Sequence, residues 1–301
     1  MSNIQITENG SGKYSPEWFY SESQTPEWIS FAHKADELRE NFINLFGIER
    51  LKSLFGKDLL TSLFYNDEGT KTNLCYRLEM DKDIREVFGS ISGGAAYKFG
   101  LFYHKKNQSW TCGSPLKPIH LTEDEAIQKA EEMRNDLVEG AEIISSFGPL
   151  DSEKDYEQLY KQLEHIPGIN MVWRMKYYQM LFPTLFAPFY GQDIQLRVLH
   201  FLNQKPSDIP FIRMGQISLY ARKCNVPGVV FAHIYGKNVG YTNETNDSDT
   251  NTLSDKKHKT HYWMYTVFDD KSWNECQQKG IMVLGMDDIG DYSQFASNQS
   301  W

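Results

Sequence analysis

Basic and aromatic residues alternate in two stretches of this 301-residue chain. Aromatic rings can stack on an extruded nucleobase, while neighbouring cations neutralise the phosphates. The pattern therefore indicates a surface for nucleic acid. The residues concerned are Trp173, Arg174, Lys176, Tyr177 and Tyr178 in the first stretch and Arg213, Tyr220, Arg222 and Lys223 in the second.

An ordinary amphipathic helix also explains the first stretch. Trp173, Tyr177 and Met180 would then face the core, with Arg174 and Tyr178 outside. We favour this interpretation for Trp173 and Tyr177. The residues expected to bind DNA are Arg174, Lys176, Tyr178, Arg213, Arg222 and Lys223.

Charge is distributed unevenly along the sequence, whose formal net charge is −9. Residues 1–150 contain 16 basic and 23 acidic residues, whereas residues 170–260 contain 11 and 6. A net charge of −9 argues weakly against nucleic acid, but the local balance matters more than the total. The middle segment is the part most suited to phosphate, although ordinary scatter of charge would give similar numbers.

Sequence patterns of catalytic and cofactor sites are missing. No GxxxxGK[ST] loop is present, and Gly10-Ser-Gly12-Lys13 lacks its spacing. His258 and His261 have a metal-compatible spacing without a third ligand, so a solvated loop is favoured. HExxH and GxSxG are absent, and the four cysteines lie far apart. We expect no enzyme activity, metal or cofactor in this chain.

The sequence also lacks targeting features. No apolar run approaches the roughly 18 residues of a membrane span, and the first twenty residues do not resemble a signal peptide. We expect a cytoplasmic protein.

Hydrophobic spacing predicts an α+β protein that begins with a flexible arm and a run of helices. Trp18, Phe19 and Tyr20 are the arm residues that could dock on the body. Helical spacing begins at Thr25-Pro26, and a second helix or a broken pair follows Gly47.

A small antiparallel sheet is predicted next. LCYRLEM, after Asn73, has the pattern of a strand, and further strands are expected within residues 88–113, around the turn KKNQ. Thr122 and Glu125 form a capping box that starts a helix, whose apolar residues recur at helical spacing from Ala126 to Ile144. Gly148-Pro149 then breaks the helix and marks a predicted domain boundary.

The middle domain is predicted to be mostly helical. Helices are expected over residues 152–165, 171–182, 192–203 and 210–224, and a buried strand over Val229–Tyr235. The predicted organisation is a flexible arm (1–24), an α+β module (25–148), a helical module (149–240), a polar linker or loop (241–260) and the incomplete start of a further β-containing domain (261–301).

Three segments together resemble a known family. IPGINMVWRMKYYQMLFPTLFAPFYGQDIQLRVLHFLN resembles the helical region upstream of the motor in McrB-like, modification-dependent restriction proteins and related defence ATPases. YWMYTVFDDKSWNECQQKGIMVLGMDDIGDYSQF resembles the opening of an EVE-like (PUA-related) domain, and FGSISGGAAYKFGLFYHKKNQSW is similar to the α+β module that often precedes both. In the tail, Lys279-Gly280, Gly285 and Gly290–Ser293 fall in the expected order, but Met286 stands where relatives usually have Trp.

The resemblance implies a recognition region for DNA that reads a modified base, within a longer restriction or anti-phage defence protein. Its AAA+ motor would lie beyond residue 301, and a separate nuclease subunit would be a partner. Tyr262, Trp263 and Trp273 are the implied base-pocket candidates, with core packing as the alternative for each. A different class also stays open, namely a protein-interaction or sensor module of a defence complex that binds no DNA and docks through its acidic first domain.

Overall fold

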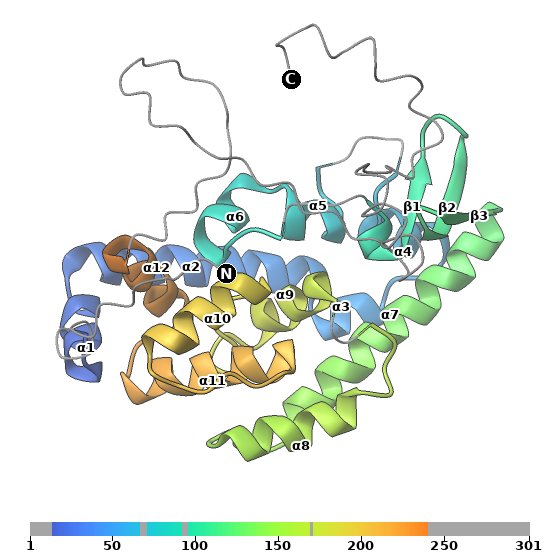
Figure 1. Cartoon of the computed structure of the whole chain (residues 1–301). Helices are drawn as coiled ribbons and strands as arrows, with labels where there is room; N and C mark the ends of the chain where they lie inside the picture. Colours follow the sequence, from blue (N-terminus) through green and yellow to red (C-terminus); the bar gives the residue numbers. More distant parts are fainter. Residues whose placement is uncertain (1–13, 67–70, 92–95, 169–170, 240–301) are drawn as a thin grey trace, which may run out of the picture. The chain divides into compact units, whose positions relative to one another are not determined.

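The computed structural model describes residues 14–66, 71–91, 96–168 and 171–239. Within these ranges the chain is mostly helical, with a small three-stranded antiparallel sheet (Figure 1). This confirms the predicted α+β class in its coarse form. None of the helices in the described ranges is long and apolar enough to cross a membrane.

Most of the helices are short and follow one another closely. They are α1 (Pro16–Ser23), α2 (Pro26–Phe46), α3 (Ile48–Lys52), α4 (Gly56–Leu63), α5 (Leu74–Glu79), α6 (Lys82–Phe88), α7 (Glu123–Ser146), α8 (Glu153–Leu163), α9 (Val172–Leu181), α10 (Gln192–Phe201), α11 (Pro210–Lys223) and α12 (Gly228–Val239), with a 3₁₀ turn η1 (Ala96–Phe99).

Helix α1 corrects the prediction of a flexible arm over residues 1–24. The Ser15 side chain caps this helix by accepting a hydrogen bond from the Trp18 amide. Phe19 is fully buried, with its ring centroid 4.7 Å from that of Phe231 on α12. Burial of Phe19, with Trp18 packed beside it, therefore helps to hold residues 16–23 on the body, as the docking alternative anticipated. Residues 1–13 lie outside the described part.

Helix α2 begins where helical spacing was predicted and buries Ala35, Phe42 and Phe46, whereas Leu45 is 45% exposed. It ends at Gly47, whose backbone approaches the last turn so closely that an added Cβ would lie 2.6 Å from the Ile43 carbonyl oxygen. The chain then continues as α3 and α4. The structure therefore has the broken pair rather than one continuous second helix.

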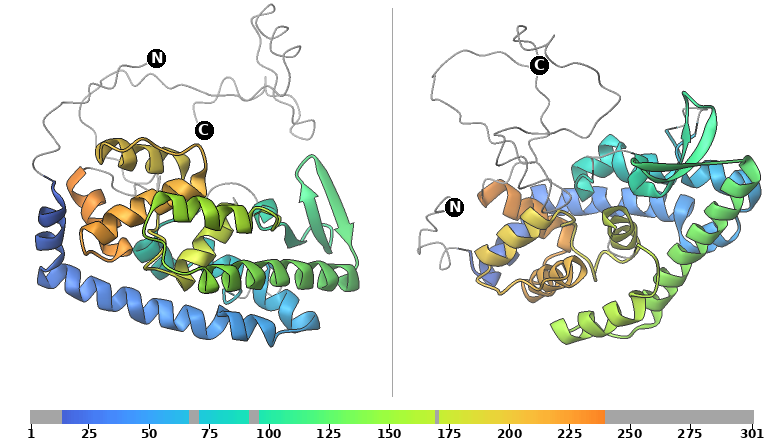
Figure 2. Two further views of the ribbon diagram at one scale, coloured as in Figure 1. Left: turned by 90° about the horizontal axis from the view of Figure 1, so that it is seen from below. Right: turned by 45° about the vertical axis from the view of Figure 1, so that its right-hand side comes forward.

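The sheet consists of β1 (Leu101–His104), β2 (Ser109–Ser114) and β3 (Lys117–Leu121), paired antiparallel in the order β1-β2-β3. The turn at residues 105–108 between β1 and β2 confirms the predicted KKNQ hairpin. Leu101 and Trp110 are buried from one face of the sheet, which lies beside α7 (Figure 2). Helix α7 has the predicted capping box between Thr122 and Glu125.

Two predicted strands are helices in the structure. LCYRLEM forms α5, because the Asn73 side chain accepts a hydrogen bond from the Tyr76 amide at 2.8 Å and starts a helical turn. Val229–Tyr235 lies within α12. A short and nearly continuous apolar run such as Val229–Tyr235 fits a buried helix as well as a buried strand, and here tertiary packing selects the helix.

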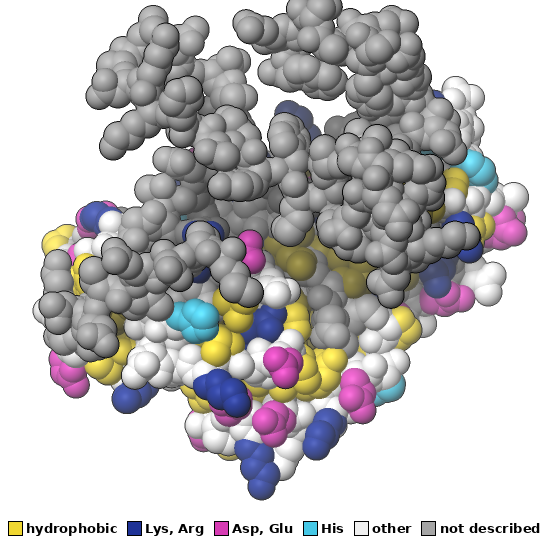
Figure 3. All heavy atoms as spheres, in the orientation of Figure 1, with side chains coloured by type: hydrophobic (Ala, Val, Ile, Leu, Met, Phe, Trp, Pro, Cys, Tyr) yellow, Lys and Arg dark blue, Asp and Glu magenta, His cyan; other side chains and the backbone are white. Residues whose placement is uncertain are grey.

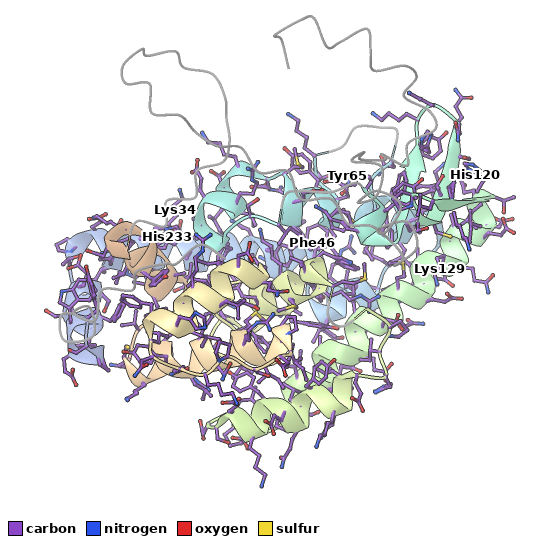
Figure 4. All side chains as sticks on the ribbon, viewed as in Figure 1. Lys34, Phe46, Tyr65, His120, Lys129 and His233 are labelled. Carbon is purple, nitrogen blue, oxygen red and sulfur yellow. The ribbon has the colours of Figure 1, made fainter. Side chains whose placement is uncertain are left out.

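The predicted boundary at residues 148–149 lies inside one compact unit, which includes all the described residues. Leu150 and Tyr156 are fully buried just after the break. Helix α8 packs on α7 and α11, so the two predicted modules share one core. The side chains between the helices fill this core, with Phe46 among them (Figure 4). The predicted linker (241–260) and incomplete domain (261–301) lie outside the described residues.

Candidate nucleic-acid interface

Helix α9 carries three of the predicted DNA-binding residues, and all three are buried. Arg174 is 3% exposed, whereas Lys176 and Tyr178 are fully buried. The Arg174 guanidinium lies against the Trp173 ring, and its Nη2 atom is 3.5 Å from Asp136 on α7. The prediction that Arg174 and Tyr178 face outward is therefore wrong, because residues 173–180 of α9 are all buried.

Lys176 stabilises a turn of the fold. Its Nζ donates a hydrogen bond of 2.6 Å to the Gly89 carbonyl, just after α6. Burial lowers the pKa of this amine to about 7; the nearby positive charge of Arg85 acts in the same direction, while Asp81 opposes it. A fully enclosed ammonium group of this kind has no surface to offer a phosphate.

Arg213 has a similar structural role on α11. Its Nε donates to the Gln195 side chain at 2.9 Å, and its Nη1 donates to the carbonyls of Ser207 and Asp208 at 2.9 and 3.0 Å. The guanidinium therefore ties the loop before α11 to α10. Arg213 is 4% exposed, so it also lacks the exposed surface needed to contact a phosphate.

Arg222 and Lys223, by contrast, lie at the surface. Arg222 is half-buried, and its Nη2 donates to the Leu150 carbonyl and lies 3.5 Å from the Tyr156 hydroxyl. The bonds found for Arg222 among the described residues use this one nitrogen, so the guanidinium is held in place with its other N–H groups available. Lys223 is exposed; a hydrogen bond from Ser15 and, to a smaller extent, the Lys223 charge lower the pKa of Glu17 on α1.

Arg222 lines a cleft that encloses about 530 Å³. Helix α2 forms one wall, α11 and the first turn of α12 form the opposite wall, and Pro183, Thr184 and Ala187 close it. Small side chains on the facing helices leave this space open, namely Ala32 and Ala35 on α2 and Ser218 and Ala221 on α11.

Arg39 is the residue of this cleft that sequence reasoning missed. It extends from α2, and its Nε atom is buried without a hydrogen-bond partner among the residues that the structure describes. Asp36 Oδ1 lies 3.9 Å from Arg39 Nε, and the Asp36 side chain is 68% exposed. The sequence feature that could have identified Arg39 is its spacing from Ala32 and Ala35, which places two small residues and a cation on one helix face.

The end of α11 positions the remaining wall. Asn225 adopts a positive φ of 54°, and its amide and that of Val226 donate to the carbonyls of Arg222 and Ala221 at 2.8 and 3.0 Å. This left-handed cap reverses the chain after Arg222. Helix α12 therefore begins at the cleft, where Gly228 and Val229 line it.

The cleft can bind an anion. Two guanidinium groups supply positive charge, and the one carboxylate among the lining residues is Asp36. On the face shown in Figure 3, basic and acidic side chains of the described residues are interspersed. The same ranges contain no group of three His, Cys, Asp or Glu residues able to hold a metal ion.

The base-pocket candidates Tyr262, Trp263 and Trp273 lie outside the described residues. Comparisons with family models, with curated proteins and with solved structures found no significant match. The resemblance to McrB-like proteins therefore stays a prediction from sequence.

Proposed function

We propose that this chain is a DNA-recognition module that contacts phosphates through Arg39, Arg222 and Lys223. The observation that carries the proposal is the cleft, where two arginines with available N–H donors line the same space. Arginine suits this role because its planar fork pairs with phosphate oxygens and its hydration is weaker than that of lysine.

The arrangement favours a small phosphate-contacting surface rather than a broad basic face. The two arginines of the cleft and the exposed Lys223 would together neutralise about three phosphates, and each contributes a slope of about −0.9 to the dependence of log affinity on log salt. Raising salt from 50 to 200 mM would then weaken binding about 40-fold. Base readout requires further residues, for which Tyr262, Trp263 and Trp273 are the candidates from sequence.

By resemblance, the module would belong to a cytoplasmic restriction or anti-phage defence protein that reads a modified base. Its AAA+ motor and a nuclease subunit would then act on the DNA that this module selects. The support for this wider role is the sequence similarity of residues 166–203 and of the tail.

A titration of the whole chain with short duplexes, unmodified or carrying methylated or hydroxymethylated cytosine, tests the proposal. Binding should be seen at 50 mM salt, and the Arg39→Gln and Lys223→Gln variants should each weaken it. Arg50→Gln on α3 is the matched control, since Arg50 is exposed and does not line the cleft. An absence of binding to every duplex at low salt would overturn the proposal.

That outcome would favour the second candidate, a protein-interaction module. The specific observation in its favour is β3, an edge strand of the described sheet, because its outer backbone lacks a neighbouring strand there. Leu116 and Ile119, in and beside this strand, are 73% and 54% exposed. Exposed apolar side chains at a sheet edge can pair with a strand of another protein.

A further inference from the structure

The Arg39–Arg222 cleft combines a polar mouth with an apolar interior. Arg39 and Arg222 are half-buried and Asn225 is exposed, whereas Phe88 and Ala187 are fully enclosed. Val226 and Val229 continue the apolar wall. This gradient suits a ligand with a charged head and a compact apolar body better than it suits an inorganic ion.

The size of the cleft agrees with a small molecule. Its volume of about 530 Å³ lies within the usual range for small-ligand sites, roughly 300–1,000 Å³. A DNA backbone passing over the mouth would use the arginines and leave the interior unfilled. The apolar interior is therefore a feature that surface phosphate contacts alone do not explain.

The charge of the mouth selects an anionic head. Among the described residues Arg39 Nε is buried without a hydrogen bond, with Asp36 Oδ1 3.9 Å away, and a buried donor of this kind ordinarily bonds to protein, water or ligand. Arg222 is already oriented by the Leu150 carbonyl, so a ligand oxygen meets a fixed guanidinium edge. Two guanidinium groups and one exposed carboxylate leave a net positive mouth.

We propose that the cleft binds a small organic phosphate monoester, with the phosphate between Arg39 and Arg222 and the organic body on the apolar wall. The inference rests on the proposed function only in using the same arginines. It goes beyond that function because it assigns the cleft a diffusible ligand, which would compete with DNA for both side chains.

Calorimetric titration of the whole chain with phenyl phosphate, phenol and inorganic phosphate tests the inference. Phenyl phosphate should bind, phenol should not, and inorganic phosphate should bind at least about tenfold more weakly because it lacks the apolar body. Arg39→Gln should reduce phenyl phosphate affinity at least about tenfold. Arg39→Gln removes no hydrogen bond found in the fold, so this variant should keep its structure, and Arg50→Gln should bind as wild type does.

A second variant tests the interior separately. Ala221→Leu would place a larger side chain in the cleft, and it should weaken phenyl phosphate more than inorganic phosphate. Equal affinity of the wild type for phenyl phosphate and inorganic phosphate would overturn the inference, as would phenyl phosphate binding unchanged in Arg39→Gln. Phenyl phosphate binding without any DNA binding would uphold it and refute the proposed function.

Discussion

Replacement of Lys176 by methionine should remove a specific pH dependence of folding stability. The wild-type amine is enclosed between α9, the turn after α6 and the Tyr190 ring, and its hydrogen bond runs to the Gly89 carbonyl. Methionine has a similar length and no charge. The substitution leaves the Gly89 carbonyl without this donor, which costs about 1–3 kcal/mol independently of pH.

The size of the pH effect follows from the lowered pKa of Lys176. Burial lowers it from 10.5 to about 7, so between these values the unfolded chain binds more protons than the folded one. The free energy of unfolding must therefore rise with pH between about 7 and 10.5, and this contribution is lost again as pH falls towards 7. With about 1.36 kcal/mol per pKa unit, the wild type should gain about 1.4 kcal/mol between pH 6 and pH 8 from this group.

Urea unfolding of both proteins at pH 6, 7 and 8 measures this effect. The stability of wild type relative to Lys176→Met should increase across the series by about 1.4 kcal/mol, because contributions of all other titrating groups cancel in the difference. A difference that stays constant from pH 6 to pH 8 would refute the reasoning, since Lys176 would then be protonated equally in folded and unfolded chains.

Two further substitutions test the packing and the helix start. Gly215→Ala on α11 should lower the free energy of unfolding by about 1–3 kcal/mol, because the new Cβ would lie 2.4 Å from the Tyr156 ring. A 2.6 Å hydrogen bond from the Tyr156 hydroxyl to the Leu185 carbonyl holds this ring in place. An unchanged urea midpoint would show that the ring can move aside. Thr122→Ala should lower the free energy of unfolding by about 1 kcal/mol, because the Thr122 hydroxyl accepts a hydrogen bond from the Glu125 amide at the start of α7. Equal thermal midpoints of the variant and wild type would contradict this role.

The sequence predicted the long and well-capped helices correctly. Thr122 and Glu125 define the start of α7, and Ser152 caps α8 in the same way. Capping and helical spacing are local properties, so neighbouring residues suffice to recognise them. The failures at α5 and α12 concern short apolar segments, where packing against distant helices decides between helix and strand.

The candidate site was harder to predict because an arginine or lysine can serve the fold as well as a ligand. Arg174 forms an ion pair with a carboxylate from another helix. Lys176 and Arg213 donate hydrogen bonds to backbone carbonyls outside their own helices. Their sequence neighbours do not reveal these partners. Arg222 is a candidate from its sequence, but that it lines the same cleft as Arg39, 183 positions earlier, depends on how α2 packs near α11 and α12.

The most direct test of the central claim is the salt dependence of DNA affinity in wild type and in the Arg39→Gln, Arg222→Gln double variant. Binding is measured at 50, 100 and 200 mM salt after confirming that the double variant remains folded. We expect a wild-type slope of about −2.7 and a slope of about −0.9 for the double variant, which would then lose only about 3.5-fold in affinity across the range. Equal slopes for the two proteins would show that the cleft does not contact phosphate.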